Sequence, residues 1–166
     1  AKTGILILGC GGVGQTLARH LAQFGCRSLF LANRDVAKAR ALAVELEPVT
    51  AGKFSLCSMG YPSAEFDLAL REIDLFIQAT SLGLKEDDPL PMDPGSLPRN
   101  AKIYDTVYRK EFTPLVQAAR KLGYPAEDGL GMLFHQGVLS FSIWTGQKPP
   151  QEHMRQALLR AAGRPS

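Results

Sequence analysis

The residues best suited to chemistry lie near the start of the chain, where closely spaced glycines follow an apolar run. The run covers residues 5–8, and the glycines are Gly9, Gly11, Gly12 and Gly14. Without a Cβ, glycine turns tightly and lets backbone N–H groups approach an anion. A helical pattern over 13–24 follows at once, and its positive N-terminal end would point at the same anion. The pattern predicts a loop that holds a dinucleotide pyrophosphate; a ligand-free turn between strand and helix is the alternative.

The second group with chemical potential is Asn33 and Arg34, at the tip of the next expected strand. An NAD site normally places Asp or Glu here to accept a hydrogen bond from the ribose 2′-hydroxyl. A guanidinium cannot accept that bond, but it suits the 2′-phosphate of NADP, and Lys38 adds a second positive charge. The sequence therefore favours NADP over NAD, with ordinary solvated Arg and Lys side chains as the alternative. Asp35 either caps the following helix or repels the phosphate.

Alternating strand-like and helix-like segments must position these groups. We expect strands at 5–8, 28–32, 53–57, 74–79, 102–105 and 125–128. Helices are expected at 13–24, 36–46, 64–71, 112–122, 131–145 and 150–161, with Pro48 ending the second of them. Such alternation predicts an α/β fold: a Rossmann-type doubly wound parallel sheet of about six strands with flanking helices. Its ligand would lie at the carboxyl ends of the strands.

The composition excludes several classes of function. With 166 residues, 45% of them hydrophobic, the chain can bury one sizeable core. The net charge of +3 is small and scattered, which argues against nucleic acid as a partner. The three cysteines have no disulfide or zinc spacing, so we expect no metal and a reducing, cytoplasmic location. No apolar stretch is long enough to span a membrane.

The second half of the chain carries motifs that resemble the shikimate dehydrogenase family. They are the segments at 79–83, 104–108, 113–115, 128–137 and 144–146. With the glycine loop and Asn33-Arg34, the resemblance runs over nearly the whole chain. It implies the C-terminal NADP-binding domain of a shikimate dehydrogenase, which transfers hydride reversibly between NADPH and 3-dehydroshikimate to give shikimate in aromatic amino-acid biosynthesis. Quinate dehydrogenases share the pattern.

The resemblance also implies roles for individual residues. Those expected to bind the cofactor are Gly9, Gly11, Gly12, Val13, Gly14, Asn33, Arg34, Lys38, Thr80, Ser81, Gly129 and Met132. Tyr108 and Gln136 are expected to contact the substrate. The alternatives are a loop aromatic for Tyr108, a core side chain for Met132 and a helix-surface amide for Gln136. Gln78 departs from the Asn often found there in the family.

The family pattern divides the chain into a dinucleotide-binding domain, 1–147, and a C-terminal helix, 148–166. In the family that helix packs on an N-terminal domain, which supplies a catalytic Lys–Asp pair and the substrate pocket. The chain begins at Ala1 without that domain, so we expect it to bind nucleotide but to be nearly inactive alone.

An apolar stripe on the last helix would lack its partner, which predicts that the chain forms a homodimer or frays at its C-terminus. Its members are Met154, Ala157, Leu158 and Ala161. A non-catalytic dinucleotide-binding or regulatory module is the alternative function for the chain.

Overall fold

The computed structural model describes residues 3–85 and 87–164. Its strands form one six-stranded parallel sheet in the order β3-β2-β1-β4-β5-β6. The strands are β1 (Gly4–Leu8), β2 (Ser28–Asn33), β3 (Ser55–Gly60), β4 (Leu75–Gln78), β5 (Lys102–Asp105) and β6 (Ala126–Glu127). The helices are α1 (Gly12–Phe24), α2 (Val36–Thr50), α3 (Ala64–Leu70), the short 3₁₀ helix η1 (Pro94–Ser96), α4 (Pro114–Lys121), α5 (Leu130–Thr145) and α6 (Gln151–Ala161). The predicted Rossmann-type fold is confirmed.

The sheet grows outward in both directions from β1 and β4, so the strand order reverses between them. Leu8 at the end of β1 is level with Ala32 of β2 on one side and Gln78 of β4 on the other. Gln78 in turn is level with Asp105 of β5. The residues that follow these four strand ends therefore share one edge of the sheet. In open α/β sheets, ligands bind at this edge, where the order reverses.

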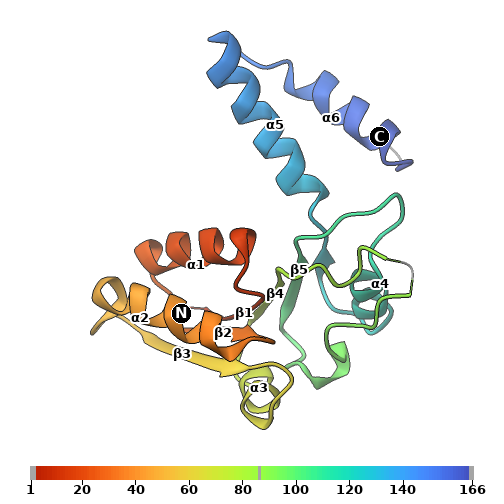
Figure 1. Cartoon of the computed structure of the whole chain (residues 1–166). Helices are drawn as coiled ribbons and strands as arrows, with labels where there is room; N and C mark the ends of the chain where they lie inside the picture. Colours follow the sequence, from red (N-terminus) through yellow and green to blue (C-terminus); the bar gives the residue numbers. More distant parts are fainter. Residues whose placement is uncertain (1–2, 86, 165–166) are drawn as a thin grey trace.

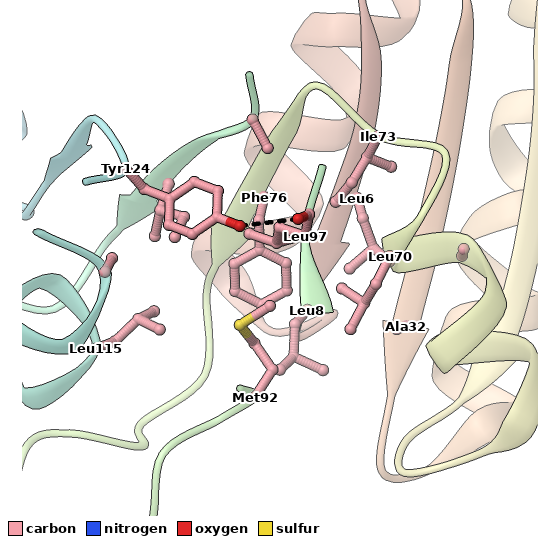
Figure 2. Close-up of a cluster of buried hydrophobic side chains, with 14 of the residues drawn as sticks. Leu6, Leu8, Ala32, Leu70, Ile73, Phe76, Met92, Leu97, Leu115 and Tyr124 are labelled. Carbon is pink, nitrogen blue, oxygen red and sulfur yellow. Dashed lines mark hydrogen bonds between the residues drawn. The ribbon is translucent and has the colours of Figure 1, made fainter. Parts of the chain in front are cut away.

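Two apolar layers fix the sheet between helices. Ile5 and Ile7 of β1 pack with α1 and α2 on one face, and Leu6 and Leu8 pack with α3 and α4 on the other. Every residue of β1 is buried, as expected for a parallel strand covered on both faces. Figure 2 shows the second layer, where the Tyr124 hydroxyl donates a 2.8 Å hydrogen bond to the carbonyl oxygen of Leu97. These layers hold the strand ends rigidly below the site.

Helices α5 and α6 form an arm that leaves the body of the domain (Figure 1). Of the residues of α5, only Leu130 and Phe134, near its start, are buried. Further along, Leu139, Ile143 and Trp144 are 61%, 69% and 83% exposed. Helix α6 runs back beside α5 in Figure 1. The distal part of this arm, residues 138–161, thus presents apolar side chains that the rest of the described chain does not cover.

Several expected boundaries were wrong, and three of them have a local explanation. Helix α2 continues through Pro48 to Thr50, since a proline in the last turn removes only one hydrogen bond near the end. Strand β3 begins at Ser55 because a turn closed by the Lys53 N–H and the Thr50 carbonyl occupies the preceding residues. Helix α4 begins at Pro114, where the Thr113 side chain caps it.

Candidate functional site

Two glycines of the loop between β1 and α1 are required by the packing of the protein itself. Gly9 has φ 108°, and a Cβ there would lie 2.5 Å from the carbonyl oxygen of Ala79. A Cβ on Gly14 would lie 1.8 Å from the carbonyl oxygen of Gly9. Neither contact could be relieved by a side-chain rotation, because both involve backbone atoms. These glycines let β1, β4 and α1 meet closely at the reversal point of the sheet.

The other two glycines of the loop have no such explanation. A Cβ on Gly11 or Gly12 would meet no atom within 4 Å, and both residues are exposed. Helix α1 has no side-chain cap and no acidic residue in its first turn. Its first N–H groups, those of Gly12, Val13 and Gly14 among them, have no helical carbonyl to bond. A bare, positively polarised backbone surface of this kind fits a phosphate group.

Asn33 links this loop to the turn after β2. Its side-chain oxygen accepts a 3.0 Å hydrogen bond from the Cys10 N–H, and its side-chain nitrogen donates to the Asp35 carbonyl at 2.9 Å. The Gly9 N–H adds a 2.8 Å bond to the Ala32 carbonyl. Asn33 therefore shapes the glycine loop, a role that its sequence position did not suggest. Its expected contact with the adenosine end stays a prediction.

Two positive side chains flank that turn. Arg34 and Lys38 are both exposed, and within residues 3–85 and 87–164 neither side chain has a hydrogen-bond or ion-pair partner. The Asp35 carboxylate accepts from the Ala37 N–H at 3.1 Å, so it caps α2. The structure thus shows the capping role of Asp35, and its effect on phosphate affinity is not tested. Two unpaired cations next to the glycine loop can bind a second anionic group.

At the end of β4, Gln78 is fully buried and holds the next loop in place. Its side-chain nitrogen donates to the Leu82 carbonyl at 2.7 Å, and its side-chain oxygen accepts from the Thr80 N–H at 2.5 Å. The Thr80 hydroxyl accepts from the Leu82 N–H at 3.0 Å, while Ser81 is exposed. Thr80 is thus fixed beside Gly9, where its methyl group would lie 2.9 Å from an added Cβ.

The turn between β6 and α5 lies close to the backbone that follows β5, as the Gly9 loop lies close to the backbone that follows β4. A Cβ on Gly129 would lie 2.1 Å from the Thr106 carbonyl oxygen, and the Gly129 N–H donates to the Val107 carbonyl at 3.0 Å. Below them, the buried Asp105 carboxylate accepts from the Val107 N–H at 3.0 Å and the Thr113 hydroxyl at 2.7 Å. Burial raises the pKa of Asp105 to about 6, although the two hydrogen bonds act in the opposite direction.

Asp128 and Arg164 form a second buried polar group here, which the sequence analysis missed. The Asp128 carboxylate accepts from the Leu130 N–H at 3.1 Å and from one Arg164 nitrogen at 3.0 Å. A second Arg164 nitrogen bonds the other carboxylate oxygen. The side chains are 2% and 11% exposed, respectively, so this ion pair is shielded from water. The expected site residues Met132, Tyr108 and Gln136 lie nearer the surface.

Met132 lines a cavity of about 590 Å³ together with Tyr104, His135 and Leu159. Tyr108 is 44% exposed, and Gln136 lies on the exposed surface of α5. Neither Tyr108 nor Gln136 makes a side-chain hydrogen bond within the described ranges. The structure therefore gathers the glycine loop, Thr80 and the Gly129 turn along one edge, and leaves both expected substrate residues available for contact.

Metal and thiol chemistry find no support in the described part of the chain. No three His, Cys, Asp or Glu side chains there are grouped as metal ligands. Cys10 lies in the glycine loop, but burial raises the pKa of its thiol to about 11, so it is a poor nucleophile. No helix among the described residues has the length and apolar character needed to cross a bilayer.

Comparison with known families agrees with the motifs. The family described as shikimate / quinate 5-dehydrogenase matches residues 1–83, and the shikimate 5′-dehydrogenase C-terminal domain matches 129–159. This chain belongs to the shikimate/quinate 5-dehydrogenase family. The two matched segments contain the glycine loop and the Gly129 turn, respectively.

Individual members of the family match over most of the chain. Shikimate dehydrogenase (NADP(+)) of Methanopyrus kandleri is 35% identical over 93% of this chain and 53% of its own length. The structure of shikimate dehydrogenase from Thermus thermophilus with NADP(H) and shikimate has a TM-score of 0.77 at 31% identity, covering 96% of this chain and 56% of that one. Quinate dehydrogenase from Corynebacterium glutamicum with NAD has a TM-score of 0.81 at 29% identity, with coverage of 96% and 56%. The chain spans about half the length of the curated relatives it matches.

Proposed function

We propose that this chain is the NADP-binding part of a shikimate dehydrogenase. The observation that carries the proposal is the bare backbone at Gly11 and Gly12, beside an uncapped helix end and the unpaired Arg34. Packing requires Gly9 and Gly14, but nothing within the protein requires glycine at the other two positions. A ligand that approaches the backbone explains them. Membership of the family and the NADP named in its relatives support the same ligand.

Each part of NADP would meet residues of matching chemistry. The N–H groups of Gly11, Gly12 and Val13 would hold the pyrophosphate, and Arg34 with Lys38 would hold the 2′-phosphate. The nicotinamide end would lie along the sheet edge, where Thr80, Ser81, Gly129 and Met132 are the expected contacts. When bound, the nicotinamide supplies the hydride for reduction of a ketone such as 3-dehydroshikimate.

We propose that the proton that the alkoxide needs comes from a group outside this chain. Asp105 and Asp128 are the buried carboxyl groups near the Gly129 turn, and hydrogen bonds within the fold engage both. We therefore propose that a further domain supplies the acid–base pair and most of the substrate pocket. Tyr108 and Gln136 would contact the substrate from this side. The chain alone should bind nucleotide with almost no turnover, because positioned acid–base groups contribute roughly 10²–10⁴-fold.

The distal part of the arm is the surface proposed to receive that further domain. Leu139, Ile143 and Trp144 are exposed there, and exposed large apolar side chains on one helix favour a protein contact. We propose that this surface and the helix within 148–166 pack on the catalytic domain. In its absence the chain would form a homodimer through the same surface. Sedimentation of the chain at several concentrations tests this, and a monomer at all of them would contradict it.

Quinate is the second candidate substrate, and the similarity to quinate dehydrogenase of C. glutamicum favours it. A regulatory dinucleotide-binding module is a third function, consistent with the glycine loop alone. Addition of a separately produced catalytic domain, followed by assays with shikimate and quinate, separates the three. Oxidation of neither compound would favour the module.

A cytoplasmic location is part of the proposal. Cys10 and Cys57 are free thiols in the structure. Thiols persist in compartments that glutathione and thioredoxin keep reduced, whereas they pair in oxidising ones. A biosynthetic NADP enzyme fits the reducing compartment.

Calorimetric titration of the chain with NADPH and with NADH tests the proposal directly. We expect NADPH to bind 10- to 100-fold more tightly, since charge-assisted hydrogen bonds to the 2′-phosphate contribute about 1.5–3 kcal/mol. The substitution Arg34→Ala should reduce that preference, since only Lys38 then faces the 2′-phosphate, and should leave NADH binding unchanged. Arg71→Ala, an exposed arginine after α3, is the matched control and should change neither. Absence of binding by both nucleotides would overturn the proposal.

A second substitution tests the bare backbone itself. Gly12→Ala meets no protein atom within 4 Å, so the fold should tolerate it, and Ala is a better helix former. Its methyl group would nevertheless occupy the space that the pyrophosphate needs. NADPH affinity should fall about tenfold or more with no loss of thermal stability. Unchanged affinity would show that the phosphate lies elsewhere.

A further inference from the structure

Arg164 lies beyond the end of α6, yet its side chain reaches the floor of the site. The chain turns at Gly163, which has φ 65°, and the Arg164 N–H donates to the Leu159 carbonyl at 2.9 Å. A glycine in this conformation followed by such a bond is a common way to end a helix. The turn directs the guanidinium into the protein, where 11% of the side chain remains exposed.

The guanidinium holds two separate segments at once. It bonds both oxygens of Asp128, as described above, and its second terminal nitrogen also donates to the Arg109 carbonyl oxygen at 3.0 Å, with the Glu111 carbonyl oxygen 3.4 Å away. It further lies over the ring of Phe112, 4.2 Å from the ring centroid. One side chain therefore joins the β6–α5 turn to the β5–α4 loop.

Both segments belong to the end of the site proposed for the nicotinamide. The Asp128 carboxylate accepts from the Leu130 N–H and so fixes the backbone on either side of Gly129. The Gly129 N–H bonds Val107, in the same loop that carries Tyr108 and is held at Arg109. A movement of Arg164 would therefore release the Gly129 turn and the Tyr108 loop together.

The Asp128–Arg164 ion pair is buried, whereas the other ion pairs of the described chain are at least partly exposed. In the pairs Arg19–Glu45, Arg27–Asp74 and Arg120–Glu127, each side chain is 32% to 73% exposed. Exposed pairs of that kind contribute little. A buried pair is costly to desolvate and needs further hydrogen bonds to be kept; the two terminal nitrogens of Arg164 have them, whereas its Nε is buried without a partner among the described residues.

We propose that Arg164 is a positioning residue for the nicotinamide end of the cofactor site, acting through Asp128 and the 109–111 backbone. The inference rests on the proposed function, because it assumes that NADPH binds along this edge. It assigns no contact between Arg164 and the cofactor. Its consequence is that the last turn of the chain sets the affinity for one half of the dinucleotide and leaves the other half unaffected.

The test compares two ligands on the same variants. NADPH occupies both ends of the site, whereas 2′,5′-ADP carries the 2′-phosphate and adenosine but no nicotinamide. In Arg164→Met we expect NADPH to bind about tenfold more weakly, while the affinity for 2′,5′-ADP changes less than twofold. Arg160→Ala, an exposed arginine in the last turn of α6, is the control for loss of charge and should change neither affinity.

Loss of Arg164 alone leaves a buried carboxylate unpaired, so the single variant could unfold. The double variant Asp128→Asn/Arg164→Met removes that charge, keeps an oxygen for the Leu130 N–H, and should show the same selective loss of NADPH affinity. Equal weakening of both ligands, or of neither, would overturn the inference. So would equal affinity of the unmodified chain for the two ligands. If the unmodified chain binds neither, the proposed function itself fails.

Discussion

The two ends of the candidate site are built in different ways. At the pyrophosphate end, every bond that shapes the loop joins residues within one β-strand–helix–strand unit, from Gly9 to Asp35, apart from the contact with β4. At the other end, the Gly129 turn is held by the bond from its N–H to the Val107 carbonyl and by the bonds from Arg164 to Asp128, so residues from distant parts of the chain take part. The first end needs little beyond the first half of the sheet, whereas the second requires the C-terminal arm to be in place.

This difference implies unequal local stability. The pyrophosphate end lies directly on β1, all of which is buried, so it should open only when the domain unfolds. The Gly129 turn leads into α5, of which only Leu130 and Phe134 are buried, and it should open in smaller fluctuations. The predictions below test this comparison, beginning with the largest expected effect.

Gly14→Ala should be the most damaging substitution, because the new Cβ would lie 1.8 Å from a backbone oxygen in the rigid end of the site. Helix α1 would have to leave β1, at a cost of about 3 kcal/mol or more. Urea denaturation measures this as a lower midpoint with an unchanged slope. Gly12→Ala, in the same helix turn but in open space, should stay within about 1 kcal/mol of the unmodified chain.

Gly129→Ala is the matched substitution at the other end, where the new Cβ would lie 2.1 Å from the Thr106 carbonyl oxygen. Here the start of α5 can move outward, so the expected cost is smaller, about 1–3 kcal/mol in the same urea experiment. Gly131→Ala, whose Cβ would meet nothing within 4 Å, is the control. The comparison of the two ends breaks down if Gly129→Ala costs as much as Gly14→Ala.

Asp105→Asn should alter the pH dependence of stability. Burial raises the pKa of Asp105 to about 6 in the folded state, against about 3.9 in unfolded chains. Between about pH 3.9 and pH 6 the folded state therefore binds more protons at Asp105 than the unfolded state does. As pH rises through this range, Asp105 lowers the free energy of unfolding, by roughly 3 kcal/mol at most. The variant should gain stability relative to the unmodified chain at pH 7.5 and much less at pH 4.5, as measured by urea denaturation.

The control for that experiment is Asp87→Asn, which removes an exposed carboxyl group. It should change stability little at either pH. An equal effect of Asp105→Asn at both pH values would contradict the assignment, since the proton uptake would then not belong to Asp105.

The smallest effect concerns reactivity rather than stability. At pH 8 in the native chain, iodoacetamide should modify Cys57, which is exposed, at least about tenfold faster than Cys10, which is buried with its pKa raised to about 11. Mass spectrometry of peptides taken over time gives both rates. Rapid modification of Cys10 would mean that the glycine loop opens readily, contrary to the rigidity argued for that end.

The fold could be predicted because its signals are local. Buried strands such as β1 appear as apolar runs, and the glycines of the first loop are themselves the signal for a close approach of backbone. Boundaries were less accurate at helix ends, where α2 continues through Pro48 and the Thr113 side chain sets the start of α4. The spacing of apolar residues indicates that a helix is present, but it does not fix the residue at which the helix begins or ends.

The polar interior of the second end could not be predicted, because its partners are far apart in the sequence. Arg164, near a chain end rich in charged residues, has the sequence context of a solvated side chain, and only the tertiary structure brings it to Asp128. Gln78 was noted as a departure from its family, but its role in holding Thr80 depends on burial. The cofactor and substrate contacts expected of the site residues stay predictions.

The exposed end of α5 also provides an intrinsic fluorescence probe. Trp144 is the only tryptophan in the sequence, and 83% of it is exposed to solvent. An indole in water emits at longer wavelength than one in an apolar contact, so its fluorescence follows events on the arm and ignores the sheet edge. A partner that covers α5 should shift the emission to the blue, whereas a small anion at the glycine loop should leave the wavelength unchanged. A single cuvette can thus separate assembly from ligand binding without any added label.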